Sequence, residues 1–286
     1  MLNTMTRVSQ VGTHRSELAE GPLWHPQENA LYWTDIKAEE LLRYSPSDGV
    51  ETICDNVIVG GFTIQKDGSL LLFMDEGNVG QYRNGKLSRK IVSLSEINAR
   101  FNDVVADPTG RVLCGTMPEP DNPGRLYLLD HDGSFRLLLE RVRVPNGLGF
   151  SPDHEHLYFT ETNNHIIHRF RYNETDGTIT ERETFVDFRD QPGKPDGLTV
   201  DTSGNVWSAM WGSQVIEQLT PEGKVADQYT LPAQYVTSVT FGGVDLKTLY
   251  ISTAQADDPA ADDGGMIFTV ETDVTGQAPR YSSVNI

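Results

Sequence analysis

The sequence is poor in cysteine and has no long apolar run. Its two cysteines, Cys54 and Cys114, are too few for a disulfide framework. No segment is long enough to cross a bilayer, and the first ten residues lack the apolar core of a secretory signal. We therefore expect a protein of the reducing cytoplasm with no membrane partner. The GxSxG, GxGxxG and P-loop signatures are also missing, which removes support for serine-hydrolase and nucleotide-binding chemistry.

Basic residues are the second scarce group. The chain has 23 Lys and Arg against 41 Asp and Glu, so its net charge is −18. A phosphate backbone or an anionic lipid surface would be repelled by this charge. We therefore expect no nucleic-acid partner, and we attribute most of the negative charge to solubility.

A phrase that recurs six times is the most informative feature present. Each copy has a polar or small residue, a short apolar run, a turn marked by Pro or Gly, and a strand rich in Tyr or Trp. The copies begin at Glu20, Gly60, Asn102, Asn146, Asp196 and Thr237. A period of about forty residues is typical of propellers and solenoids.

The segments between these phrases predict strands. After Asn146, NGLGF, LYFTET and HIIHRFRYN are separated by turns rich in Asn, Asp and Gly. We predict an all-β, six-bladed β-propeller with four antiparallel strands per blade and a central metal pocket, formed by residues 1–286 as one domain. The stretch RVSQVGTH before Glu20 is predicted to complete the last blade and close the ring.

The opening residues of the six phrases are the candidate site. In equivalent repeats they lie near the starts of the innermost strands, at the mouth of the channel. Glu20, Asn102, Asn146 and Asp196 would bring four oxygen donors together, a set that suits Ca²⁺, Mg²⁺ or Mn²⁺ and that Zn²⁺ also accepts. Asn146 or Asp196, taken singly, could instead serve a local turn, whereas Glu20 is not a usual turn residue. As a set they indicate a cation, because facing carboxylates repel one another without one.

Four motifs resemble a known family. EGPLWHPQENALYWTDI, RFNDVVADPTGRVLCGTM, PNGLGFSPDHEHLYFTET and KPDGLTVDTSGNVWSAMWG are similar to the blade motifs of the SMP-30/gluconolactonase/luciferin-regenerating-enzyme family, which includes regucalcin-like proteins. The resemblance implies a six-bladed propeller that binds one divalent metal and hydrolyses sugar lactones. It places the metal ligands at Glu20, Asn146 and Asp196, and substrate contacts at Arg100 and Asn102.

One segment departs from the family pattern. Animal regucalcin-like members carry consecutive acidic residues after GTM, and the second of these helps to hold the sugar. Here the run is GTMPEP, in which Pro120 follows Glu119. Either Glu119 contacts the substrate from a shifted backbone or this part of the pocket differs, so the preferred sugar stays open. Met117 and Trp211 are candidates for the pocket walls.

The expected chemistry is hydrolysis of an aldonolactone by water. A divalent ion would polarise the carbonyl and stabilise the oxyanion. Asp196 is the family-implied general base as well as a ligand; the alternative is that the metal itself supplies hydroxide, and the sequence does not choose between them. The guanidinium of Arg100 would hold lactone oxygens or an acid group.

Two other functions stay open from the sequence. One is hydrolysis of an organophosphate or aryl ester at the same metal site, and the other is a non-catalytic Ca²⁺-binding propeller. The sugar, the native metal and the oligomeric state are not predicted. His154, His156, His165 and His168 lie in or beside predicted turns, so we expect them to be solvated rather than metal ligands.

Overall fold

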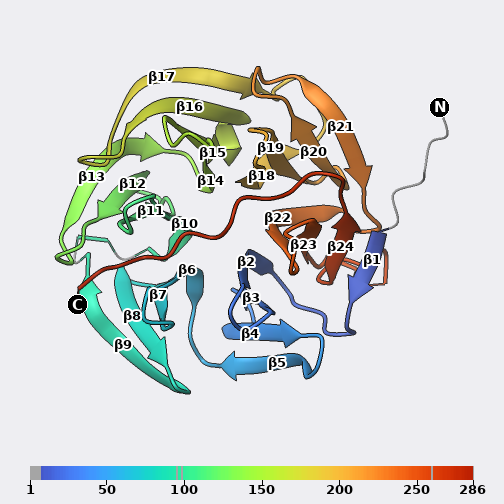
Figure 1. The fold of residues 1–286 in the computed structure, drawn as a ribbon, viewed down its shortest axis with the longest axis horizontal. Helices are drawn as coiled ribbons and strands as arrows, with labels where there is room; N and C mark the ends of the chain where they lie inside the picture. The colour runs from blue at the N-terminus through green and yellow to red at the C-terminus, as the bar shows by residue number, and fades with distance from the viewer. Residues whose placement is uncertain (1–7, 95, 98, 259, 286) are drawn as a thin grey trace.

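The computed structural model describes residues 8–94, 96–97, 99–258 and 260–285. These residues form 24 β-strands and one short 3₁₀ segment, η1 (Thr162–Asn164). None of the described segments is a helix long and apolar enough to cross a membrane. Figure 1 shows the strands arranged in sheets around a central axis.

Four sheets have four antiparallel strands each, in chain order. The first has β2 (Ala19–His25), β3 (Ala30–Asp35), β4 (Glu40–Ser45) and β5 (Gly49–Cys54). The second has β6 (Val59–Ile64), β7 (Leu70–Met74), β8 (Asn78–Arg83) and β9 (Lys86–Ser93). The third has β10 (Phe101–Ala106), β11 (Val112–Thr116), β12 (Gly124–Leu129) and β13 (Phe135–Val142). The fourth has β14 (Pro145–Phe150), β15 (His156–Glu161), β16 (Ile166–Asn173) and β17 (Thr178–Asp187).

The remaining eight strands form one larger sheet. One half holds β18 (Lys194–Val200), β19 (Val206–Trp211), β20 (Val215–Leu219) and β21 (Val225–Thr230). The other half holds β22 (Tyr235–Gly242), β23 (Thr248–Ala254), β24 (Ile267–Glu271) and β1 (Val8–Val11). The expectation of six separate blades is corrected here: the fold is all-β and propeller-like, with four separate four-stranded sheets. The halves of the fifth sheet are joined where Trp211 pairs with Tyr235, and the two rings lie 4.5 Å apart.

The predicted ring closure is confirmed. Strand β1, from the start of the described chain, pairs antiparallel with β24, with Val8 opposite Val270 and Val11 opposite Ile267. The sheet at the closure therefore contains strands from both ends of the sequence. A strand from the start of the described chain thus completes the sheet formed by the last repeat, which closes the ring.

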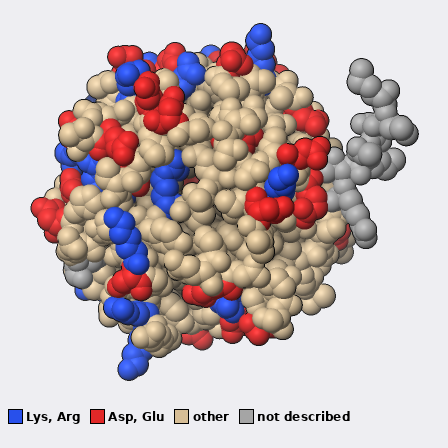
Figure 2. All heavy atoms as spheres, in the orientation of Figure 1, with Lys and Arg blue, Asp and Glu red and all other residues tan. Residues whose placement is uncertain are grey.

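The core lies between neighbouring sheets because the second strand of each sheet is largely apolar on both faces. Strands β3, β7, β11 and β15 are buried along almost their whole length, whereas the outer strands β9 and β17 are mostly polar and contain no buried residue. Aromatic rings fill the gaps between sheets: Phe73 and Phe101 meet edge to face at 5.3 Å, and Trp24 stacks on Tyr250 at 5.4 Å. Acidic and basic side chains are spread over the face shown in Figure 2.

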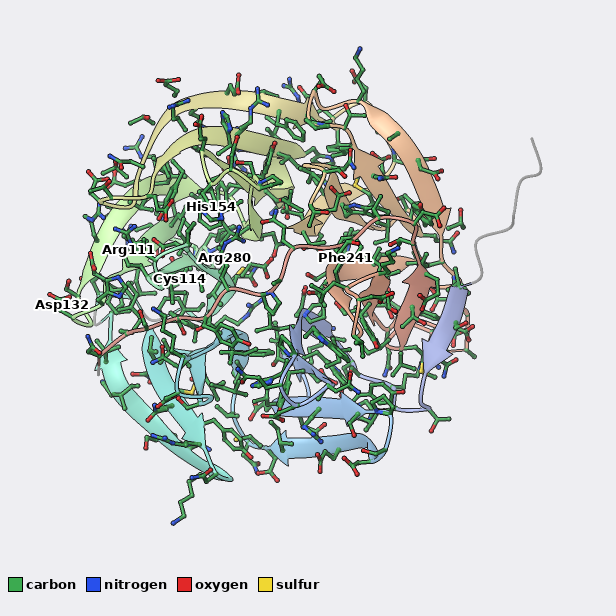
Figure 3. The ribbon with its side chains drawn as sticks, viewed as in Figure 1. Arg111, Cys114, Asp132, His154, Phe241 and Arg280 are labelled. Carbon is green, nitrogen blue, oxygen red and sulfur yellow. The ribbon has the colours of Figure 1, made fainter. Side chains whose placement is uncertain are left out.

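A C-terminal strap, residues 274–285, crosses one face of the ring and has no counterpart in the repeats (Figure 1). Its backbone is hydrogen-bonded to several sheets in turn: Gly276 N–H donates to Leu246 O, Ser282 N–H to Ile64 O, and Ser283 N–H to Gly110 O. Arg280, on the strap, lies near the middle of the ring in Figure 3. The innermost strand of each repeat is its first: β2, β6, β10, β14, β18 and β22. The strap therefore covers the end of the channel at which these innermost strands finish.

Candidate functional site

The six phrase-opening residues lie at a shared structural position. In each innermost strand the pairing register shifts at or beside that residue, for example between Glu20 and Leu23, between Asn146 and Leu148, and between Pro195 and Leu198. The same irregularity occurs in β6, β10 and β22. A β-bulge of this kind bends the strand and re-aims a side chain. The repeat thus turns the starts of all six innermost strands in the same way.

Glycines explain how close these strands come. A Cβ atom on Gly147 would lie 2.6 Å from Asp196 O, and one on Gly197 would lie 2.1 Å from Ser238 Oγ. Both distances are far below a normal contact, so only glycine fits directly after Asn146 and Asp196. The Asn-Gly and Asp-Gly pairs in the sequence are therefore requirements of packing around the axis, and they crowd the site residues together.

The structure buries four of the predicted residues at this end of the channel. The exposed fractions are 8% for Glu20, 5% for Asn102, 6% for Asn146 and 3% for Asp196. Glu20 Oε2 and Asp196 Oδ1 are buried and have no hydrogen-bond partner among the described residues. An unpaired carboxylate oxygen away from water is costly. The site thus holds two carboxylate oxygens that no described protein group satisfies.

Burial and charge repulsion both act on the pKa values of these groups. Burial raises the pKa of Glu20 and of Asp196 well above the ordinary values, and neighbouring Asp103 adds to both shifts. Burial also raises the pKa of Asp103, to about 7. For Arg100, burial lowers the pKa, against the attraction of Glu20, Asp103 and Asp196. Three carboxyl groups therefore share one partly buried arginine.

Asn102 joins the arginine to the next innermost strand. Its Oδ1 accepts a hydrogen bond from Arg100 Nη1 (2.5 Å), while its Nδ2 donates to Pro145 O (2.7 Å) and to Asn146 Oδ1 (2.6 Å). Asn146 Nδ2 in turn donates to Thr162 Oγ1 (2.9 Å). These bonds fix the orientation of both amides. The side chains of Arg100, Asn102, Asn146 and Thr162 form one continuous polar chain along the ring.

The three further pocket candidates lie at this end, Met117 and Glu119 after β11 and Trp211 at the end of β19. Met117 N–H donates to Arg100 O (3.1 Å), so the segment after β11 runs beside the arginine. Glu119 belongs to a tight turn, in which its side chain accepts a bond from Asn122 Nδ2 (3.3 Å). Trp211 ends β19 and packs on Tyr235. All three are partly exposed.

Sequence reasoning missed two residues and misjudged one. Asp103 and Thr162 were not singled out, although Asp103 directly follows Asn102. The expectation of a solvated His168 is wrong: the side chain lies on β16, is 5% exposed, and its Nε2 is 3.2 Å from Glu161 Oε2. The cost of burying the Glu161 carboxylate beside His168 is offset by Arg182, whose Nη2 also donates a hydrogen bond to Glu161 Oε2 (3.0 Å).

Below the ring lies a cavity of about 140 Å³ that extends to the C-terminal strap. Its walls come from the innermost strands, and Asp103, Gln277 and Arg280 are among its polar lining. Within the described residues, no three His, Cys, Asp or Glu side chains form a group that could hold a metal ion. The predicted donor set differs in kind, because it combines two carboxylates with the carboxamide of Asn146.

The fold and the site define a propeller-like protein with a buried cluster of carboxylates, amides and one arginine at one end of its channel. The chain belongs to the SMP-30/gluconolactonase/LRE-like family, whose model matches residues 18–255.

Two curated relatives and two solved structures illustrate the similarity. A pentonolactonase of Haloferax volcanii is 41% identical, with 99% of each chain covered. A 6-deoxy-6-sulfogluconolactonase of Pseudomonas putida is 34% identical, covering 92% of this chain and 94% of the relative. A luciferin-regenerating enzyme superposes with a TM-score of 0.90 at 25% identity, over 98% of this chain and 100% of the other. The calcium-binding protein regucalcin of Agrobacterium tumefaciens, at 24% identity, has the same fold, with a TM-score of 0.90 over 96% of this chain and 97% of the other.

Proposed function

We propose that this protein is a divalent-metal-dependent lactonase that hydrolyses an aldonolactone, of the pentonolactone or gluconolactone type, to the aldonic acid. The observation that carries the proposal is the pair of buried carboxylates, Glu20 and Asp196, each with an oxygen that has no partner. The similarity to a pentonolactonase and to a sulfogluconolactonase supports the substrate class.

The donor set fits one hard cation. Glu20 Oε2 and Asp196 Oδ1 are buried and unpaired, and Asn146 presents an amide oxygen whose orientation is fixed by Asn102 and Thr162. Carboxylate and amide oxygens are the ligands that Ca²⁺, Mg²⁺ and Mn²⁺ prefer. When bound, the ion would act as a Lewis acid on the lactone carbonyl and favour the ionised carboxylates.

The protein groups have separate tasks in this scheme. Asp196 is the proposed base as well as a ligand: with one carboxylate oxygen on the ion, the other would take a proton from the attacking water. Both hydrogen bonds that Arg100 makes to described residues run from Nη1, which leaves Nε and Nη2 for the oxygens of the substrate. Water adds to the carbonyl carbon, the bond to the ring oxygen breaks, and that oxygen takes up a proton. Asn102 holds Arg100 and Asn146 at a fixed separation.

The blade count belongs to the same proposal. We count the eight-stranded sheet as two blades, because its halves share a single residue pair and each half contributes one bulged innermost strand. Six blades then place one opening residue each around the axis. As one domain, the chain should unfold in a single transition detected alike by near-UV and far-UV circular dichroism.

The test is proton release from a panel of pentonolactones, glucono-1,5-lactone, an aryl ester and an organophosphate, corrected for spontaneous hydrolysis. Protein stripped by a chelator should be inactive on lactones and regain activity with one of Ca²⁺, Mg²⁺, Mn²⁺ or Zn²⁺. Full activity of the stripped protein would refute the metal. Turnover of only the ester or the organophosphate would point to the rival hydrolase, and no turnover at all would favour a binding propeller.

A further inference from the structure

We propose that Asp35 and Glu161 are positioning residues that hold the loops carrying Glu20 and Asn146. The roles of Glu20 and Asn146 as ligands rest on the proposed function. Asp35 and Glu161 are the last residues of β3 and β15, which are the second strands of their sheets. Both are buried, with exposed fractions of 1% and 3%.

Asp35 fixes the segment that leads into Glu20. Its Oδ2 accepts a hydrogen bond from Glu17 N–H (2.7 Å), and its Oδ1 accepts bonds from Leu18 N–H (3.0 Å) and Ala38 N–H (3.2 Å). Glu17 lies three residues before Glu20. Three backbone donors that no strand partner satisfies are thus satisfied by one carboxylate, which ties two loops to the end of β3.

Glu161 does the same for Asn146. Its Oε1 accepts a hydrogen bond from Arg143 N–H (2.8 Å), and Arg143 again lies three residues before the ring residue. Its Oε2 is held by His168 and Arg182 from the two strands further out in the same sheet. A glutamate is longer and more mobile than an aspartate, and these two contacts restrain it.

The parallel between the two sheets indicates a shared role. In both, an acid at the same strand end accepts the backbone N–H at the same offset from a proposed ligand. The third proposed ligand, Asp196, is placed differently: Gly193, three residues before it, packs so tightly that a Cβ there would lie 2.6 Å from Ser213 Oγ. Glu20 is buried beside other carboxyl groups. Repulsion between them favours outward movement when no cation is bound, and an anchored loop resists that movement.

The experiment compares graded substitutions at each anchor. Asp35→Ala and Glu161→Ala remove both acceptors, whereas Asp35→Asn and Glu161→Gln keep one acceptor oxygen and carry the test if the alanine variants do not fold. Affinity for Ca²⁺ and Mn²⁺ is measured by calorimetry on chelator-stripped protein. We expect the alanine variants to bind about 10- to 100-fold more weakly, as is usual for groups that orient metal ligands, with partial recovery in the Asn and Gln variants.

Asp107→Asn is the matched control. Asp107 is a buried acid, 1% exposed, that also accepts backbone N–H groups, but it follows β10 near the strap, at the other end of the channel. The Asp107→Asn substitution should lower the melting temperature of the protein and leave its affinity for metal ions unchanged. Unchanged affinity in both anchor variants, or an equal loss in Asp107→Asn, would overturn the proposal.

A second readout needs no metal. The side-chain amide signal of Asn146 in ¹⁵N NMR reports its bonds to Asn102 and Thr162. It should shift or broaden in Glu161→Ala, less so in Glu161→Gln, and stay in place in Asp107→Asn. A wild-type protein that binds no metal would refute the proposed function while this measurement still decides the anchor: an unmoved Asn146 signal in Glu161→Ala would contradict it.

Discussion

The two ends of the central channel both bury carboxylates, but they treat them in opposite ways. At the strap end, Asp107 accepts bonds from the N–H groups of Thr109, Gly110 and Arg111, and also from Arg111 Nε and Tyr172 Oη. At the opposite end, called the ring end because the phrase-opening residues lie there, Glu20 and Asp196 each keep an oxygen without a partner among the described residues. Burial opposes ionisation of Asp107, yet the bonds from Tyr172 and Arg111 outweigh it and lower its pKa. At the ring end burial dominates and the pKa values rise.

This contrast separates stability from function. A buried carboxylate with a full set of donors holds the fold together, whereas one left without them is stabilised only by a proton or a cation. Strained or unsatisfied groups that persist in a well-packed protein are typical of functional sites. Variants at the two ends should therefore fail in different assays.

The largest effect is expected for Asp196→Ala. Loss of a proposed ligand and base should lower kcat/KM for the preferred lactone by about 10³-fold or more, with the melting temperature of the stripped protein unchanged or raised, because one repelling carboxylate is gone. Steady-state kinetics and metal analysis on the same preparation measure this. Retained metal with full activity would remove Asp196 from the site.

Asp107→Ala should show the converse. Removing one partner from the buried pair with Arg111 typically costs about 3–5 kcal/mol, because a buried guanidinium loses its counter-charge. Urea unfolding should show this loss, while kcat/KM per folded molecule stays at the wild-type value. A variant that is stable but inactive would mean that the two ends are coupled.

Arg100→Ala separates substrate contact from metal binding at the ring end. Arg100 is proposed to touch the substrate and not the ion, so kcat/KM should fall by about 10²-fold while metal content is retained. Arg100→Lys keeps the charge but not the planar fork, and should recover only part of the rate. Loss of metal from Arg100→Ala would show that the arginine also holds the carboxylates in place.

The smallest expected effect is a difference in pH dependence. Asp103 has a folded pKa of about 7, above the ordinary value of 3.8, so the folded stripped protein binds more protons than the unfolded chain between these values. Its stability should therefore fall as pH rises from 4 to 7, by about 1–3 kcal/mol. Asp107 is shifted the other way, so its contribution is lost only on acidification below 3.8. Urea titrations across this range, repeated on Asp103→Asn, check the sign: a flat profile for wild type would contradict it.

The repeat made the ring end predictable. Glu20, Asn146 and Asp196 recur at the same point of the phrase, and Gly147 and Gly197, which follow the last two, mark the close approach of the innermost strands. A periodic sequence feature becomes a shared position in space, so the clustering of these side chains followed from spacing alone.

Contacts between segments without a common period could not be predicted. The strap contains no phrase, and its bonds to Ile64, Gly110 and Leu246 join distant parts of the chain. Burial of His168 depends on Glu161 and Arg182, which lie on the neighbouring strands. The pairing of Trp211 with Tyr235, which merges two halves into one sheet, depends on how closely the sheets approach. None of these leaves a local pattern.

The strap restricts how small molecules can enter and leave the cavity. Gln277 and Arg280 line the floor of the cavity, and the backbone on either side is fastened to the surrounding sheets. For the proposed lactonase, a sugar acid formed at the ring must then leave by the route through which the next lactone enters. The aldonate should behave as a competitive inhibitor, raising the apparent KM and leaving kcat unchanged.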